Sequence, residues 1–281
     1  MRRLALLATT MTLVGALLAG TAGAGRTLRA DLRPLPDERV VTVLLIGSDK
    51  GLPRRGNPLR GNADAIHLVA VDTKRLRATI VDIPRDSLIG GTKVNAHLAY
   101  GGPDRLRSAL SAYTGVRIDH HVLTTFGGFA GIVRSMGGLQ VQLARPVHDS
   151  AARASLPAGK QRLKGSEAVA FSRARKPLAD GDFDRTRNQG KLLRAAHRQL
   201  RNEARDLPSL TRLTAAAARN TSTDLTAPQM LRLAALAVRI KPSDVRQDSL
   251  SGPLGYAGYQ SVVHLRSGDT FARLRRGAIG P

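Results

Sequence analysis

Residues 40–46 read VVTVLLI, and the three residues that follow are GSD. A nearly continuous run of β-branched and aliphatic side chains is typical of a strand that is buried within a sheet. The change to Gly, Ser and Asp ends the run, so Asp49 comes directly after the strand. The sequence therefore predicts a buried central strand with an acidic side chain at its end.

Further strands and helices alternate along the rest of the chain. Residues 65–71 and 78–83 predict two strands, which a turn at 74–75 joins as a hairpin or as a longer pairing. Apolar residues at helical spacing predict helices at 104–114 and 184–203. The pattern also predicts strands at 118–125, 139–143 and, at a sheet edge, 262–265, helices at 126–136, 165–171 and 227–239, and a loose tail after residue 271. Strands interleaved with helices favour an α/β or α+β sandwich.

The composition limits the kinds of partner. The chain has 281 residues, a formal net charge of +23 and no cysteine. So basic a chain fits three anionic partners: nucleic acid, an anionic membrane surface or a phosphorylated substrate. Aromatic residues make up only 3%, which disfavours single-stranded nucleic acid because that ligand usually stacks on aromatic rings. The lack of cysteine excludes disulfides, thiolate metal sites and a cysteine nucleophile.

The first 25 residues predict a signal or anchor segment. Arg2 and Arg3 precede an uncharged run at residues 4–25, long enough for one membrane crossing. Two interpretations stay open: a retained anchor, or a signal peptide cleaved after the small residues AGA at 22–24. Both place the remainder outside the cytoplasm, at the membrane or secreted to the cell wall, and so disfavour nucleic acid. Residues 26–39 predict a linker, and the single folded domain is expected at 40–275.

Two aspartates flank the first two predicted strands. Asp49 follows the strand at 40–46, and Asp64 precedes the strand at 65–71. If these strands are neighbours, both carboxylates lie at one edge of the sheet. Two carboxylates, with phosphate oxygens completing the shell, suit Mg²⁺. The alternative is that each aspartate only caps a loop.

Arginines follow at the ends of later elements. Arg85 comes after the strand at 78–83 and Pro84, a rigid position from which a guanidinium can point into a cleft. In an extended segment, Arg173 and Arg175 would point to the same side. Two like charges there favour an anion between them, because guanidinium groups bind phosphate in a bidentate manner. The alternatives are a surface ion pair between Arg85 and Asp86 and a solvated basic face at 173–175.

The basic helix at 184–203 begins with the motif GDFDRTRNQ at 181–189. A helix N-terminus favours anions, and Arg185 and Gln189 lie four residues apart on one helix face. Asp182 or Asp184 can also be a simple N-cap. Three histidines, His97, His120 and His121, fit no standard set of metal ligands and are interpreted as structural or surface residues.

Six motifs, taken in order, resemble the LytR-CpsA-Psr family of cell-wall glycopolymer ligases. They are LLIGSD at 44–49, ADAI at 63–66, IPRD at 83–86, KVNAH at 93–97 with AYGG at 99–102, FSRAR at 171–175, and GDFDR at 181–185 with RNQ at 187–189. The resemblance is strong over residues 40–205 and extends weakly to about 275. It departs where the family has Arg-Ser-Asp-Thr and this chain has NADA at 62–65.

The resemblance implies an α/β fold with a mixed central β-sheet flanked by helices in three layers, and with an apolar lipid-binding tunnel. It implies a phosphotransferase that moves a glycopolymer from a polyprenyl-pyrophosphate carrier to peptidoglycan and forms a phosphodiester. The implied partners are this lipid-linked glycan, peptidoglycan and the membrane, without nucleic acid. Alternatives are a non-catalytic binder of lipid-linked envelope glycans, a transcriptional regulator of cell-envelope genes, and a side activity as a pyrophosphatase.

The resemblance also implies a role for each site residue. Asp49 and Asp64 would hold Mg²⁺ or Mn²⁺, and Asp64 and Arg85 would have catalytic roles, with Asp64 as the candidate base. Asp182 would be a further acidic member of the pocket. The pyrophosphate oxygens would contact Arg85, Lys93, Arg173, Arg175, Arg185 and Gln189.

Overall fold

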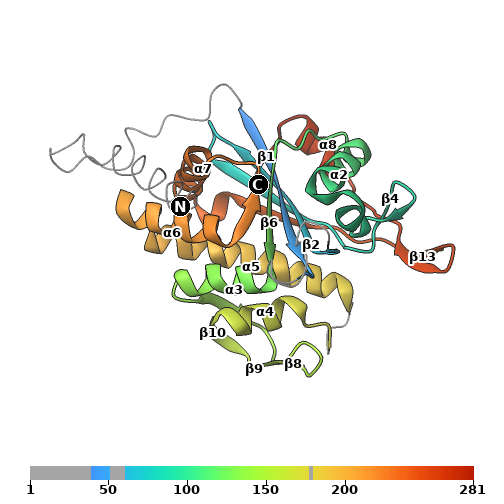
Figure 1. The fold of residues 1–281 in the computed structure, drawn as a ribbon, viewed down its shortest axis with the longest axis horizontal. Coiled ribbons are helices and arrows are strands. Elements are labelled where there is room, and N and C mark those ends of the chain that lie inside the picture. The colour runs from blue at the N-terminus through green and yellow to red at the C-terminus, as the bar shows by residue number, and fades with distance from the viewer. Residues whose placement is uncertain (1–38, 51–60, 177–179) are drawn as a thin grey trace, which may run out of the picture. The chain divides into compact units, whose positions relative to one another are not determined.

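The computed structural model describes residues 39–50, 61–176 and 180–281 (Figure 1). The predicted signal or anchor segment at 1–25 lies outside these ranges, as does the predicted linker except for Arg39. Within these ranges, no helix combines the length and the apolarity that a membrane crossing needs.

A six-stranded mixed sheet forms the centre of the domain. Its strands, in spatial order, are β11 (Thr221–Thr223), β6 (His120–Thr125), β1 (Val40–Ser48), β2 (Ala63–Asp72), β3 (Arg77–Asp82) and β12 (Val245–Ser249). β1 lies between β2 and β6, so the predicted central strand is confirmed. β2 and β3 pair antiparallel across a short turn, which confirms the predicted hairpin.

The strand directions bring three functional segments to one edge of the sheet. β1 is parallel to β6 and antiparallel to β2, and β3 is antiparallel to β2 and parallel to β12. The end of β1, the beginning of β2 and the end of β3 therefore meet. Asp49, Asp64 and Arg85 all come from these three ends.

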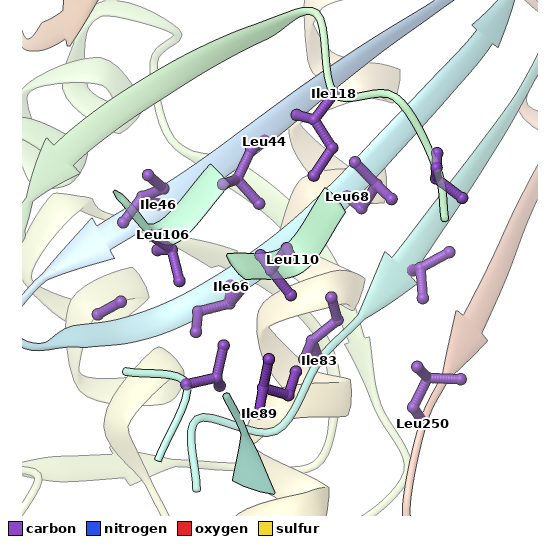
Figure 2. Packing of buried hydrophobic residues seen from close by; sticks show 14 of the residues in the cluster. Leu44, Ile46, Ile66, Leu68, Ile83, Ile89, Leu106, Leu110, Ile118 and Leu250 are labelled. Carbon is purple, nitrogen blue, oxygen red and sulfur yellow. The ribbon is translucent and has the colours of Figure 1, made fainter. Parts of the chain in front are cut away.

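One face of the sheet is covered by α2 (Ala96–Thr114) and α8 (Thr270–Arg275). Between this face and α2 lies the main core, in which Leu44, Ile66 and Leu68 of the strands pack against Leu106 and Leu110 of the helix (Figure 2). Each buried leucine side chain contributes roughly 1.5–3 kcal/mol of hydrophobic stabilisation. This core fixes β1 and β2 as a rigid platform beneath the acidic edge.

The opposite face is covered by α5 (Asp182–Glu203), α6 (Leu207–Arg219) and α7 (Ala227–Arg239), which completes three layers (Figure 1). α5 comes very close to the sheet. Gly190 is the reason, because a Cβ atom there would overlap the side chains of Asp82 on β3 and Gln247 on β12. The predicted sandwich of helices around a mixed sheet is therefore confirmed.

Smaller elements extend the domain alongside α5, against which β7 and α4 pack. They are α3 (Phe126–Ser135), β7 (Leu139–Leu143), β8 (Val147–Asp149), β9 (Ala154–Leu156), β10 (Gly159–Leu163) and α4 (Gly165–Arg173). β7 pairs with β10, and β8 pairs with β9, so they form two small antiparallel sheets of two strands each. α3 and α4 pack side by side above them (Figure 1).

The C-terminal part differs from the prediction in two places. The strand expected at the sheet edge is β14 (Gln260–Val263), which pairs with β13 (Leu254–Ala257) in a hairpin that is separate from the six-stranded sheet. The tail expected to be loose forms α8, since Phe271, Leu274 and Ile279 are buried in the main core. Both predictions were wrong because long-range packing, which the local pattern does not contain, decides these segments.

Candidate functional site

The site begins with an ion pair between Asp64 and Arg85. Asp64 lies at the start of β2, beside an irregularity of the β1–β2 pairing at Gly47 and Ser48. Arg85 follows β3 and Pro84, and its Nη1 donates to Oδ1 of Asp64. The two side chains are only 20% and 22% exposed. The predicted positions at strand ends therefore place a guanidinium and a carboxylate in direct contact.

Asp49 lies at the same edge, held by Asn62. Its Oδ1 accepts from the Asn62 backbone N–H at 2.8 Å, and its Oδ2 accepts from Nδ2 of the same residue at 3.0 Å. Burial raises the pKa of Asp64, the Arg85, Arg185 and Arg175 guanidiniums oppose this, and the charge of Asp49 raises it further. The two carboxylates are thus near enough to repel each other.

α5 contributes a buried arginine and an amide. Arg185 is 4% exposed, and its Nη2 donates to the carboxylate of Asp182 at 2.9 Å. Burial lowers the pKa of this guanidinium, which stays cationic at neutral pH. Nε2 of Gln189 donates to the carbonyl oxygen of Ser172 at 3.0 Å and lies 3.4 Å from that of Asp64. Gln189 therefore links α5 to both β2 and α4.

The end of α4 contributes two further cations. Arg173 is the last residue of α4, and its guanidinium lies over the ring of Phe126 with Cζ 5.1 Å from the ring centroid. Arg175 follows one residue beyond the extended Ala174, and its Nε lies 3.4 Å from Oδ1 of Asp182. The expectation of an extended segment was wrong for Arg173, which is helical. Both arginines nevertheless reach the same cavity.

A carboxylate that the sequence analysis did not identify holds this segment in place. Oδ2 of Asp149, at the end of β8, accepts from the backbone N–H groups of Arg175 at 2.8 Å and Lys176 at 3.0 Å. Its Oδ1 accepts from Ala152 at 3.1 Å. The contact to Ala152 closes a local turn, and an Asp at the start of a turn is a signal that the sequence does contain. The contacts to residues 175 and 176 have no signal in the sequence.

These residues line a cavity of about 310 Å³ that is open to solvent on one side. Five of the predicted site residues line it, together with Asp149 and Lys176: Asp64, Arg173, Arg175, Arg185 and Gln189. Arg85 and Asp182 are in contact with lining residues, and Asp49 interacts electrostatically with Asp64. Lys93 lies one step further away, because its Nζ pairs with Asp86 at 3.2 Å, and Asp86 lies 3.6 Å from Nε of Arg85.

Two guanidinium nitrogens at this site lack hydrogen-bond partners. Nε of Arg85 and Nε of Arg185 are buried, and neither donates to any group in the part of the chain that the structure describes. A buried donor without an acceptor costs about 1–3 kcal/mol. Both atoms are inaccessible in this structure, so an anionic ligand in the cavity would act on these side chains mainly through charge, by reducing the repulsion that Arg85 and Arg175 exert on Arg185. The geometry thus favours a polyanionic group such as a phosphate.

The acidic side chains present only a partial shell for a metal. Over residues 39–50, 61–176 and 180–281, no group of three or more His, Cys, Asp or Glu side chains could hold an ion. Asp49 and Asp64 together still offer hard oxygen donors at one edge, and their mutual repulsion fits a divalent cation whose other ligands are phosphate oxygens and water. Among the histidines, Nε2 of buried His97 lies 2.9 Å from the carbonyl oxygen of Ile89.

Comparisons with known proteins identify relatives of the whole domain. The model of the LytR_cpsA_psr family matches residues 26–275. The chain is 33% identical over 166 residues to the probable cell wall biosynthesis protein LcpB of Corynebacterium glutamicum, covering 54% of this chain and 40% of that protein. It is 25% identical to the polyisoprenyl-teichoic acid–peptidoglycan teichoic acid transferase TagV of Bacillus subtilis, covering 75% of this chain and 57% of that protein. The chain thus spans about half the length of these curated relatives.

The fold is also found in solved structures. The crystal structure of TagV from B. subtilis superposes with a TM-score of 0.71 at 23% identity, covering 85% of this chain and 95% of that one. At this identity the likeness concerns the fold alone. It confirms the mixed sheet between helical layers.

Proposed function

Because this chain belongs to the LytR-CpsA-Psr family, we propose that it transfers a glycopolymer from a polyprenyl-pyrophosphate carrier to peptidoglycan. The observation that carries this proposal is the cavity in which Asp64, Gln189 and the guanidiniums of Arg173, Arg175 and Arg185 meet. A relative of this chain, TagV of B. subtilis, is named a transferase of teichoic acid to peptidoglycan. The cavity supplies the cationic surroundings that a diphosphate needs.

The arginines bind the donor's pyrophosphate and stabilise charge that develops during transfer. Arg85 and Arg185 are held in place by their ion pairs with Asp64 and Asp182. Arg173 and Arg175 approach from the α4 side of the cavity. Fixed guanidiniums that are already oriented cost little reorganisation, and this form of electrostatic stabilisation accounts for much of phosphoryl-transfer catalysis. Lys93 pairs with Asp86, which also lies beside Arg85, and so balances part of the negative charge next to that guanidinium.

The transfer forms one P–O bond and breaks another. A sugar hydroxyl of peptidoglycan attacks the phosphorus that carries the glycan, and the bond to the polyprenyl phosphate breaks, so polyprenyl phosphate leaves. The hydroxyl proton needs an acceptor. Asp149 is unsuited, because hydrogen bonds from the Lys176 and Arg175 backbone lower its pKa to about 2. Asp64, the other carboxylate that lines the cavity, is therefore the proposed base.

Asp49 and Asp64 are the proposed ligands of a Mg²⁺ or Mn²⁺ ion. When bound, such an ion would neutralise phosphate charge as a Lewis acid. The coupling between the two carboxylates and their place at one edge of the sheet support this assignment. The same site would hydrolyse the carrier pyrophosphate if water replaced the sugar hydroxyl, which would give the chain a side activity as a pyrophosphatase.

The lipid chain is proposed to lie between the sheet and the helices of the α5 face. Beside the buried side chains of that face, several apolar side chains are only partly buried and could contact a lipid chain; they include Leu45, Val69, Val71, Val122, Leu193 and Leu233. The predicted segment at 1–25 would attach the domain to the outer side of the membrane, where carrier and peptidoglycan meet, or would be cleaved from a secreted form. This placement is supported by the sequence alone.

A reconstituted transfer assay tests the proposal. The full chain in liposomes, with a labelled polyprenyl-pyrophosphate glycan, Mg²⁺ and peptidoglycan, should move label to the insoluble wall fraction. We expect Asp64→Asn to reduce the transfer rate by about 100-fold while donor binding persists, since removal of a general base typically costs 10²–10⁴-fold. Arg205→Ala, which removes an exposed cation from beyond α5, is the matched control. Donor binding by the native chain without any transfer would identify a binder and not an enzyme.

A further inference from the structure

The β13–β14 hairpin presents large side chains to solvent in a chain that has few of them. Leu254, Tyr256 and Tyr259 are 71%, 79% and 105% exposed. The chain has only four tyrosines and no tryptophan, so half of its tyrosines lie on this one hairpin. Exposed rings cost hydrophobic free energy, and grouped exposure of this kind marks an interaction surface.

The base of the hairpin is fixed next to the cationic site. The backbone N–H of Val263 donates to the carbonyl oxygen of Asp86 at 2.9 Å, and Val263 forms a parallel bridge with Ser87. Asp86 itself pairs with Arg85 and Lys93. Val262 and Val263 are buried, so the hairpin is rigid at its base while its tip projects beside β4 (Leu88–Ile89) (Figure 1).

The charge of the hairpin indicates the chemistry of its ligand. Residues 251–266 contain a single formal charge, at Arg266, in a chain with a net charge of +23. An anionic membrane surface would be bound through Lys and Arg, which the tip lacks. A neutral sugar ring fits better, because its C–H face packs on a tyrosine ring and its hydroxyls bond to neighbours such as Gln260 and Ser261.

We propose that Tyr256 and Tyr259 bind sugar rings of the acceptor glycan and so position its hydroxyl group near the cavity. The inference rests on the proposed function, since it assigns the acceptor side of the same site. It concerns binding only and can be measured without the lipid donor.

The test compares Tyr256→Ala/Tyr259→Ala with the native full chain. The affinity of the variant for purified peptidoglycan sacculi, measured by co-sedimentation, should be about tenfold lower. Each lost ring contact contributes more than area burial alone. Tyrosine fluorescence, which no tryptophan masks, should change when the native chain binds an N-acetylglucosamine tetrasaccharide and stay constant in the variant. Tyr256→Phe/Tyr259→Phe keeps both rings and should retain most of the binding. Tyr100→Ala, which removes a 60% exposed ring from α2, is the control and should bind as the native chain does.

Two outcomes would overturn the proposal. The first is unchanged sedimentation of the alanine variant with sacculi. The second is hairpin-dependent binding to phosphatidylglycerol vesicles together with no response to the tetrasaccharide, which would identify a membrane contact. Titration with geranyl pyrophosphate and Mg²⁺ separates this question from the proposed function. If the native chain does not bind that probe, the assignment of the cavity fails whatever the hairpin does.

Discussion

At the scale of single residues, Asp149 accepts hydrogen bonds from the backbone of the segment that carries Arg175. Backbone hydrogen bonds from Lys176 and Arg175 lower its pKa to about 2. Because the folded-state pKa lies below the unfolded value near 4, the carboxylate stabilises the fold above pH 4 and loses this contribution as pH falls towards 2. Asp149 therefore connects the stability of the domain to the position of Arg175.

We predict that Asp149→Asn lowers the melting temperature at neutral pH and removes part of the acid-induced loss of stability. Between pH 4 and pH 2, the melting temperature of the variant should fall less steeply than that of the native chain. Thermal unfolding followed by circular dichroism from pH 2 to pH 7 measures this. Asp104→Asn, at an exposed α2 position paired with Arg107, serves as the control and should leave the slope unchanged. Parallel curves for native and Asp149→Asn chains would contradict the assignment.

Among the arginines of the site, Arg185 is the one whose side chain is most buried. It is 4% exposed, its Nη2 is held by Asp182, and its Nε has no acceptor in the described part of the chain. A lysine would keep the charge but offer no planar fork. We expect Arg185→Lys to weaken geranyl pyrophosphate binding by about tenfold, or about 1.4 kcal/mol, measured by calorimetry. Arg205→Lys is the control, and equal losses in both variants would show that only bulk charge matters.

At the scale of elements, the sequence predicted the strands that end at the site. It did not predict the conformation of the segment after α4, which lines the cavity. The runs at 40–46, 65–71 and 78–83 are apolar enough to be strands whatever surrounds them, and the structure confirms all three. The turn after α4 has no such pattern. Its shape depends on Asp149, which lies more than twenty residues away in sequence, and so Arg173 was wrongly expected to be extended.

The close approach of α5 to the sheet depends on Gly190, the residue that follows Gln189 of the cavity. Gly190 lies on α5, five residues after Arg185. The side chains of Asp82 and Gln247 come so close to it that no Cβ atom would fit. We predict that Gly190→Ala destabilises the fold by about 1–3 kcal/mol although alanine favours helices, because overpacking outweighs helix propensity. Urea unfolding measures the change, with Lys191→Ala at the neighbouring exposed position as the control. A stabilised Gly190→Ala chain would mean that α5 does not pack this closely.

At the scale of the whole molecule, the cavity and the β13–β14 hairpin differ in charge. The net charge of +23 and the arginines of the cavity would attract the proposed anionic donor, whereas residues 251–266 carry one formal charge and would contact the neutral sugar rings of the proposed acceptor. With this arrangement, the donor would be attracted over a long range by charge, whereas the acceptor would be bound by short-range contacts with the hairpin. It allows an anionic lipid carrier to be captured without excluding an uncharged sugar.

The two binding events should therefore respond differently to salt. Raising NaCl from about 0.1 M to 1 M shortens the Debye length from about 10 Å to about 3 Å, which screens exposed charges strongly and buried ones less. We predict that binding of geranyl pyrophosphate weakens several-fold over this range and then levels off, because Arg185 stays buried. Binding of the N-acetylglucosamine tetrasaccharide, followed by tyrosine fluorescence, should change by less than about twofold, because stacking on Tyr256 and Tyr259 involves no net charge. A parallel loss of both affinities would mean that the hairpin, like the cavity, binds through charge.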